Sequence, residues 1–508
     1  MKKLFLSLLP LIGLISGCTL TPKDDGDDPL DPPGPSGEYS EPIDPFNPGS
    51  ASPKLVASNE YKNLFTPSNK VTFKIDLPLE SARFINTYQT DHNNCIYHDY
   101  YVPCSLTYKI GNGTETTIEE VGIRAKGNLS RRTFLEGDVM NRSAHFKLKF
   151  DETFDGDEYD EISALAPFKK TWESSDARKE RSKRRFAQLK ALDIKWNRND
   201  DETRVKQDFG LKLFRDNGVM AQYTNLADTT FSIDGNEYHD IYEIFEPIDG
   251  VFINHRFASD EADGDLYKCT YTDKGPANFK ASCEIGVEDN TRYYHPTYDL
   301  KTNKKTNTTH TALKNLFSVM NSNLNDDTKY QSELEKVFNI DGFMKYEAVA
   351  FLLGNFDDIR NNANNYYIYF SNKTSMSYVI PYDFDRLLGT GCENRKNYMT
   401  DFSADSTKMQ CSNDWQSMNI YWKTVCRTTS GHPSRIEEYY NMYTSKIAEL
   451  INNETFSPSA FTSYVNQYSS EFNCNPSGAG NDNISFSDYY NLKLAAIKSN
   501  NPEINITK

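Results

Sequence analysis

The chain has no Cys-x-x-Cys motif among its nine cysteines, and their spacing does not match a structural zinc site. It is also short of basic residues, since 56 Lys and Arg face 72 Asp and Glu and give a formal net charge of −16. That balance argues against nucleic acid and against peripheral binding to anionic lipid, because both need a basic surface. Beyond the N-terminus there is no apolar run of transmembrane length and no internal repeat. The remaining length is ample for one bilobed domain or for two domains.

The N-terminus is where the sequence is most apolar. Two lysines (Lys2 and Lys3) precede the apolar stretch Leu4–Ile15, which is typical of a secretory signal rather than of a membrane span. The tetrad that ends at Cys18, Ile-Ser-Gly-Cys, resembles a bacterial lipobox, in which the cysteine is lipidated and becomes the mature N-terminus. The alternative is an ordinary secretory signal with a coincidental cysteine. We therefore predict a lipoprotein signal peptide over residues 1–18 and an extracytoplasmic, lipid-anchored protein of the cell envelope.

The next segment, residues 19–55, is acidic and rich in Pro and Gly. Such a composition buries too little apolar area to offset chain entropy, so we predict a disordered tether that leads to a folded domain over residues 56–505. Removing Cys18 leaves an even set of eight cysteines, and export permits up to four disulfides. The simplest pairs are Cys95 with Cys104 and Cys269 with Cys283.

The hydrophobic patterns change from period two to helical spacing along the domain. Alternating apolar residues predict strands in the first half, and apolar residues three or four apart predict helices in the second half. Strands are predicted at 71–77, 106–110, 121–125, 145–150, 230–233 and 238–245, and helices at 203–217, 311–321, 331–338, 341–353, 433–452, 457–471 and 485–498. The charged segment Glu173–Arg185 is predicted to be a surface helix or loop. We therefore expect an α+β fold with two lobes and a cleft between them.

The stretch Gly354–Gly389 carries the strongest chemical signal. Asp357 opens an Asn-rich loop that leads into the apolar run 366–370, and a second run, 378–382, ends just before Asp383 and Asp385. If the two runs pair as a hairpin, the loop and the two later acids lie at the same end of the ribbon. Carboxylate and amide oxygens suit Mg²⁺ or Mn²⁺, so we predict a metal site formed by these acids with Asn365 or Asn362. The alternatives are a solvated turn or a structural Ca²⁺ site.

A second candidate lies in the β-rich half. Gly127 permits a tight turn at which backbone amides can approach a phosphate, and Lys147 or Lys149 on the next strand can reach the same anion. The alternative is an ordinary solvent-facing hairpin.

Several segments, in order, resemble the CotH kinase family, named for spore coat protein H. They are VGIRAKGNLSRR, FKLKFD, LFRDNGV, FSIDGNEYHDIYEIFEPID, GNFDDIRNNANNYYIYF and YVIPYDFDRLLG. The resemblance implies an atypical protein-kinase-like bilobed fold, with an N-lobe over about 56–250 and a C-lobe over 251–505. The sequence departs from the family pattern at Tyr382, where Trp is usual, at Asn364, where His is frequent, and in the turn after Lys126.

The resemblance also implies roles for individual residues. Asp357 matches the catalytic acid, and Asn365, Asp383 and Asp385 match metal-binding positions, with Asn362 fitting typical kinase spacing better than Asn365. The residues expected to bind the nucleotide are Lys147, Lys149, Arg124 and Glu246. Lys147 or Lys149 would neutralise phosphate charge, with Glu243 or Glu246 positioning the lysine.

The implied activity is transfer of the γ-phosphate of ATP to protein hydroxyls by a monomer that depends on Mg or Mn. Two other functions stay open. One is a surface-displayed binding or adhesion module with little catalysis, because extracytoplasmic nucleotide is scarce and aromatic residues are abundant. The other is a Ca²⁺-stabilised, carbohydrate-associated protein.

Overall fold

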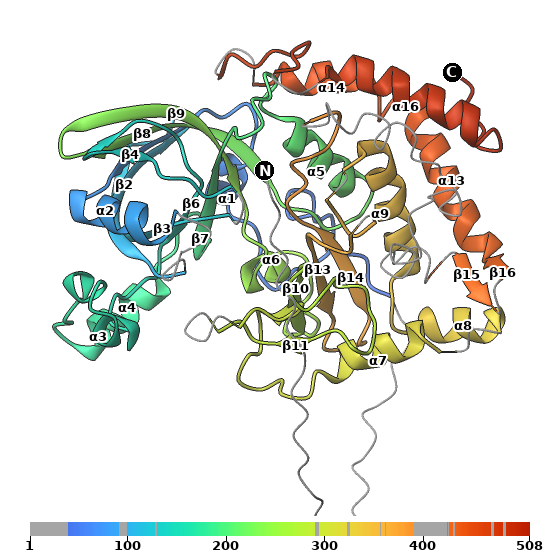
Figure 1. The fold of residues 1–508 in the computed structure, drawn as a ribbon, viewed down its shortest axis with the longest axis horizontal. Coiled ribbons are helices and arrows are strands. Elements are labelled where there is room, and N and C mark those ends of the chain that lie inside the picture. The colour runs from blue at the N-terminus through green and yellow to red at the C-terminus, as the bar shows by residue number, and fades with distance from the viewer. Residues whose placement is uncertain are drawn as a thin grey trace, which may run out of the picture.

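Seven strands in the first half of the chain close into a barrel (Figure 1). The computed structural model describes residues 39–90, 99–127, 130–289, 294–322, 326–355, 357–360, 362–390, 424, 426–429, 432–468, 472–480 and 484–508. The barrel order is β1-β2-β3-β6-β7-β9-β8, and the parallel pairing of β1 with β8 closes it. Its strands are β1 (Val71–Asp76), β2 (Val102–Ile110), β3 (Thr116–Ala125), β6 (Phe146–Lys149), β7 (Ala191–Trp196), β8 (Thr224–Ile233) and β9 (Asn236–Phe245).

The alternation of buried and more exposed side chains along these strands explains why the barrel forms. In β1 the side chains of Val71, Phe73 and Ile75 are buried, while the residues between them are more exposed. Leu192 and Ile194 of β7 are likewise buried in the barrel core, so Asp193 and Lys195 lie on the other face of the strand. The barrel therefore holds its own apolar core and turns charged residues of β7 outward.

A second sheet and most of the helices form the rest of the protein. The sheet order is β11-β12-β10-β13-β14. Its strands are β10 (Asp265–Cys269), β11 (Ile285–Gly286), β12 (Tyr298–Leu300), β13 (Tyr366–Phe370) and β14 (Ser377–Pro381). Short two-stranded pairs are β4 (Leu135–Glu136) with β5 (Val139–Met140) and β15 (Cys426–Thr429) with β16 (His432–Arg435).

The helices divide between the two parts of the molecule. Around the barrel lie α1 (Asn59–Leu64), α2 (Leu79–Tyr88), α3 (Glu158–Glu161), the 3-10 helix η1 (Ala166–Phe168) and α4 (Ser175–Lys183). The other part of the molecule, which holds the second sheet, contains α5 (Lys206–Asp216), α6 (Gly250–Asn254), α7 (Thr311–Met320), α8 (Asp327–Leu334), α9 (Ile340–Leu353), α13 (Glu437–Asn452), α14 (Pro458–Val465) and α16 (Phe486–Asn500). The central helix α9 is apolar on nearly all sides because it packs against α13, α5 and β14.

The mixed α/β content and the order of elements confirm the β-rich first half and the helical second half. The likeness of the two parts to kinase lobes stays a prediction. Several helices differ from their predicted extents. The helix predicted at 331–338 is α8 at Asp327–Leu334, and the one predicted at 457–471 ends at Val465. Residues 432–435 pair with 426–429 as a strand, so α13 begins only at Glu437 rather than at residue 433.

The predicted tether differs in its last part. Residues from Tyr39 onward pack on the fold, and backbone hydrogen bonds join Ile43 N to Arg256 O (2.9 Å) and Leu55 N to Asn254 O (2.8 Å). The ring of Phe46 stacks on Tyr223, with ring centroids 4.2 Å apart. The predicted tether is therefore wrong over residues 39–55, where aromatic rings and backbone pairing hold the segment on the fold. Residues 1–38, including Cys18, lie outside the described part.

The predicted disulfide between Cys269 and Cys283 is also wrong. Cys269 is a buried free thiol on β10, and Cys283 precedes β11, with β12 between the two strands. No disulfide therefore joins Cys269 to Cys283. Cys104 is a buried free thiol, and Cys95 lies outside the described residues.

No helix within the described ranges is long and apolar enough to cross a membrane.

Candidate active site

The hairpin β13–β14 brings together the two acidic segments that the sequence analysis singled out. Tyr366 pairs with Pro381 at the end of the antiparallel ladder, and Tyr382 N–H donates to Asn365 O at 3.2 Å. The loop before β13 and the acids after β14 therefore lie at the same end of the ribbon, as predicted.

The loop that carries Asp357 begins where α9 ends. Gly354 closes the helix with φ +67°, a left-handed conformation in which glycine has no steric penalty. The Asp357 Oδ1 atom accepts hydrogen bonds from the Nδ2 atoms of Asn362 (2.7 Å) and Asn364 (2.9 Å), and Asn365 Nδ2 donates to the Asp357 backbone oxygen at 3.0 Å. The Asn-rich loop thus fixes the orientation of the candidate catalytic carboxylate.

Two of the candidate metal ligands have strained backbones. Asn365 has φ +54° and Asp383 has φ +56°, values that non-glycine residues adopt rarely and at a cost of about 1–3 kcal/mol. Asn and Asp tolerate this region better than other side chains, because their short polar groups interact locally. Both residues lie at the same end of the hairpin.

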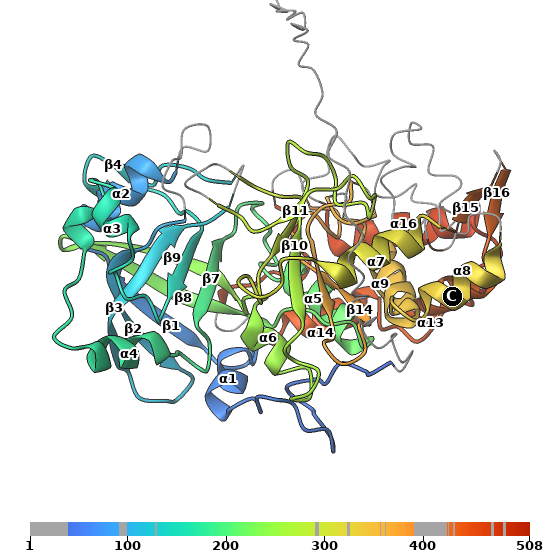
Figure 2. The ribbon, with the colours of Figure 1, turned by 90° about the horizontal axis from the view of Figure 1, so that it is seen from below.

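Asp383 is paired with Lys195 of β7, so the second sheet meets the barrel at this ion pair. Figures 1 and 2 show β7 on the side of the barrel that faces the second sheet. Desolvation by the surrounding protein opposes ionisation of Asp383, but Lys195 and Lys126 outweigh it and lower the pKa of the carboxyl group. Burial and the neighbouring charge of Asp383 raise the pKa of Asp385 to about 6.

A second group of charges lies on the same side of the barrel. Asp193 accepts from Lys126 at 2.6 Å and from Lys147 at 3.1 Å. Burial, together with the charges of Lys195 and Lys147, lowers the pKa of Lys126 to about 8. The Lys126 ammonium also lies 5.6 Å from the ring centre of Tyr382, next to Asp383 in sequence. Lys195 and Lys126 therefore lie near Asp383, and Lys147 is linked to Lys126 through their shared partner Asp193.

Four other residues were predicted to bind the nucleotide or to position the lysine. The structure gives each of them a different partner. Lys149 pairs with Glu152 at 2.8 Å, and Arg124 pairs with Asp99 at 3.0 Å beside the ring of Tyr101.

Glu246 is fully buried and bonded to Arg256 rather than to a lysine of the site. Glu243, the other candidate partner, lies opposite Lys195 in the β7–β9 pairing, and burial raises its pKa.

Lys195, Asp193 and Lys126 were missed as site residues in the sequence analysis. A signal was present, because Asp193 and Lys195 alternate with the apolar residues Leu192 and Ile194 in a run typical of a half-buried strand. That alternation places both charges on one face of the strand, but it does not show which oppositely charged residues they contact.

The donor set suits a hard cation in its chemistry. Asp383 and Asp385 supply carboxylates and Asn365 supplies an amide, and the Lys195 ammonium already neutralises Asp383. Across the described ranges, no group of three or more His, Cys, Asp or Glu side chains is close enough to hold a metal ion. A metal would therefore depend on two carboxylates, the amide and oxygens of a ligand.

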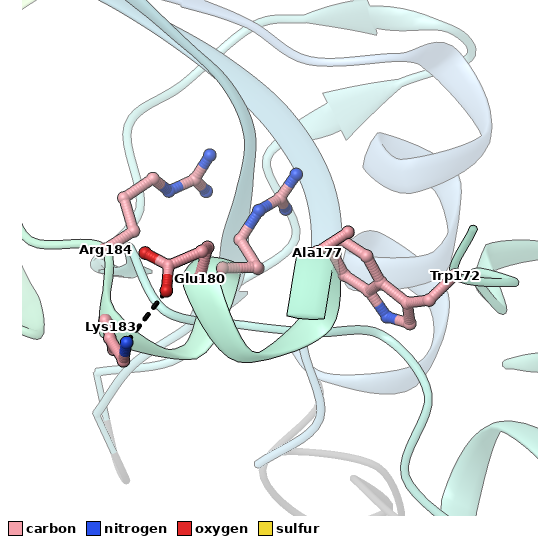
Figure 3. Close-up of a pocket in the computed structure, with 6 residues that line it drawn as sticks. Trp172, Ala177, Glu180, Lys183 and Arg184 are labelled. Carbon is pink, nitrogen blue, oxygen red and sulfur yellow. Dashed lines mark hydrogen bonds and ion pairs between the residues drawn. The ribbon is translucent and has the colours of Figure 1, made fainter. Parts of the chain in front are cut away.

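An open depression of about 490 Å³ lies elsewhere, on the insertion between β6 and β7. Figure 3 shows its lining on α4, with Lys183 paired to Glu180 at 2.8 Å. Arg181 is bonded to Glu120, and Arg184 donates to three backbone oxygens, those of Phe150, Glu119 and Glu120. These basic groups therefore hold the insertion against the barrel.

The fold and the site define a mixed α/β protein in which a barrel and a second sheet meet at a cluster of lysine, aspartate and asparagine side chains. A family model described as CotH kinase protein matches residues 163–490, more than half of the chain, and the chain belongs to this family. Membership indicates a kinase-like function. No curated protein matches the chain.

Proposed function

We propose that this protein transfers the γ-phosphate of ATP to a hydroxyl group of a protein substrate. The observation that carries the proposal is the meeting of Lys195 from the barrel with Asp383, at the end of the hairpin where the loop that carries Asp357 enters β13. Two asparagines hold the Asp357 carboxylate. Protein kinases place a base, an amide and metal-binding acids in the same order along the chain. Family membership supports the same reaction class.

In this proposal the side chains of the site orient the reacting groups and stabilise the negative charge of the phosphate. Asp357 receives the proton of the acceptor hydroxyl, and its fixed orientation aims that oxygen at the γ-phosphorus. Lys195, Lys126 and Lys147 stabilise the negative charge on the phosphate oxygens. The bond from the γ-phosphorus to the bridging oxygen breaks as the new bond to the hydroxyl oxygen forms, and ADP leaves.

Asp383, Asp385 and Asn365 are the residues that would hold Mg²⁺ or Mn²⁺. When bound, the cation would neutralise phosphate charge and help to align the nucleotide. The ion pair with Lys195 supports this role for Asp383, because the carboxylate already faces a positive charge.

The direct test uses the purified protein with Mg²⁺ or Mn²⁺ and radiolabelled ATP. We expect label to appear on a protein acceptor and ATP with metal to raise the thermal unfolding midpoint. If the wild-type protein showed no transfer and no stabilisation, the proposed function would be contradicted.

Lys195 and Lys149 form a matched pair of variants. We expect Lys195→Met to reduce phosphate transfer by about 10²-fold or more, because Lys195 directly contacts the Asp383 carboxylate. Lys149→Met should change transfer by less than about threefold, because Lys149 is paired with Glu152 instead. Equal losses in steady-state assays of the two variants would show that Lys195 has no special role.

We also propose that Cys18 anchors the protein outside the cytoplasm through lipid, with the charged domain exposed beyond the membrane. Stable anchoring needs more than one acyl chain, since each buried methylene contributes about 0.8 kcal/mol. Labelled palmitate fed to expressing cells should enter the wild-type protein and be absent from Cys18→Ser. Equal incorporation by both proteins would rule out Cys18 as the lipidated residue.

A further inference from the structure

His145 lies immediately before β6, and only 7% of its surface is exposed. Its Nδ1 atom accepts a hydrogen bond from the backbone N–H of Trp196 at 3.1 Å, and the two rings pack with centroids 5.6 Å apart. A ring nitrogen that accepts a hydrogen bond carries no proton, so the proton of the neutral ring is on Nε2. The barrel backbone therefore fixes the tautomer of His145.

The other edge of the ring faces the turn that begins at Lys126. A Cβ atom placed on Gly127 would lie 3.5 Å from His145 Cδ2, the carbon bonded to Nε2. Lys126 N–H donates to the His145 backbone oxygen at 2.8 Å, which holds the turn beside the ring. Gly127 has φ +100°, so the turn requires glycine here. Nε2 thus lies next to the turn at which the sequence analysis placed a phosphate.

The charges around His145 keep its ring neutral. Burial, followed by the positive charges of Lys195, Lys126 and Arg198, lowers the pKa of His145, and Asp383 opposes them. Among the described residues, none accepts a hydrogen bond from Nε2. The result is a fixed, uncharged N–H donor between lysines that already favour an anion.

We propose that His145 donates a hydrogen bond from Nε2 to a phosphate group of the bound nucleotide. The inference rests on the proposed function and adds a binding residue that lies before the segment matched to the family, residues 163–490. The lysines supply charge, whereas His145 supplies a hydrogen bond whose direction is set by Trp196. In this proposal His145 binds the phosphate part of the nucleotide and not the nucleoside part.

Two substitutions distinguish the roles of the two ring nitrogens of His145. The amide nitrogen of Gln lies near the position of Nε2, so His145→Gln keeps the donor and loses the acceptor. The amide oxygen of Asn lies near Nδ1, so His145→Asn keeps the bond to Trp196 and loses the donor. Calorimetric titrations with ATP, ADP and adenosine, together with KM and kcat for ATP, report on each variant.

We expect His145→Asn to weaken ATP binding by about 10-fold or more and to raise KM by a similar factor, because it removes a hydrogen bond to a charged group. His145→Gln should stay within about threefold of the wild type, and adenosine should bind all three proteins equally. Equal ATP affinity in His145→Asn and the wild type, or equal losses of ATP and adenosine, would overturn the proposal. An equal loss of ATP affinity in His145→Gln and His145→Asn would also overturn it.

A measurement on the wild-type protein avoids any effect of substitution on folding. With ¹⁵N-labelled histidine, the Nε2 resonance of His145 should shift on addition of ATP and not on addition of adenosine. No shift in a protein that binds ATP and transfers phosphate would overturn the role of His145 alone. Absence of both ATP binding and transfer would instead identify a failure of the proposed function.

Discussion

Asp383→Asn is expected to reduce phosphate transfer by about 10²–10³-fold or more and to abolish the stabilisation that metal with ATP confers. Asp383 pairs with Lys195 where the hairpin meets the barrel, and its charge acts on Asp385. Asparagine tolerates the positive φ of this position, so the substitution removes charge with little change in backbone strain. Transfer from labelled ATP and the unfolding midpoint, with and without metal and ATP, measure the two effects.

Asp260→Asn is the matched control for this experiment. Asp260 pairs with Lys373 at 2.9 Å on the surface, and both side chains are at least half exposed. This variant should retain wild-type transfer and nucleotide-linked stabilisation, because exposed ion pairs contribute little. Normal transfer and stabilisation in Asp383→Asn would remove Asp383 from the proposed metal site.

Glu246→Gln is expected to lower the free energy of unfolding at neutral pH by about 3–5 kcal/mol, because it leaves a buried arginine without its counter-ion. Glu246 accepts from Arg256 at 2.7 and 3.0 Å and from Tyr61 at 2.7 Å, and the three side chains are almost completely buried. Denaturant unfolding measures the loss. Glu237→Gln, which breaks the exposed pair with Lys74, should cost less than about 1 kcal/mol.

The cost of Glu246→Gln should also depend on pH. Burial opposes ionisation of Glu246, but Arg256 and His255 lower its pKa from an ordinary value of 4.5 to about 2. A carboxyl group with a lowered pKa contributes stability above pH 4.5 and loses it as the pH falls from 4.5 towards 2. The difference between wild type and Glu246→Gln should therefore be constant near neutrality and shrink below about pH 4.5. A constant difference down to pH 3 would show that Glu246 is not ionised in the folded protein.

Local patterns in the sequence were sufficient for most individual elements. The alternation in 71–77 matches β1, and the turn Asp234-Gly235 joins β8 to β9 as expected. The hairpin β13–β14 was predicted with its acids at one end, because strand pairing alone places residues before one strand beside residues after the next. These features depend on neighbours in the chain, which sequence periodicity describes.

The partners of buried charges depended on the whole barrel. Lys147 was expected to pair with a glutamate, but closure of β6 against β7 places Asp193 within 3.1 Å of it. Glu246 resembled a site residue in sequence, yet it lies beside Arg256 because α6 packs there. Cys269 and Cys283 are close in sequence, but no disulfide joins them.

By itself, the sequence determined the order of Asp357, Asn365, Asp383 and Asp385 around one hairpin, because that order follows from local pairing. Only the tertiary structure decided which cations meet those acids. Closure of the barrel sets the outward face of β7, and packing of that face on the second sheet places Lys195 on Asp383 and Lys126 nearby. A contact between residues almost two hundred positions apart depends on both packing steps, and no local pattern in the sequence records it.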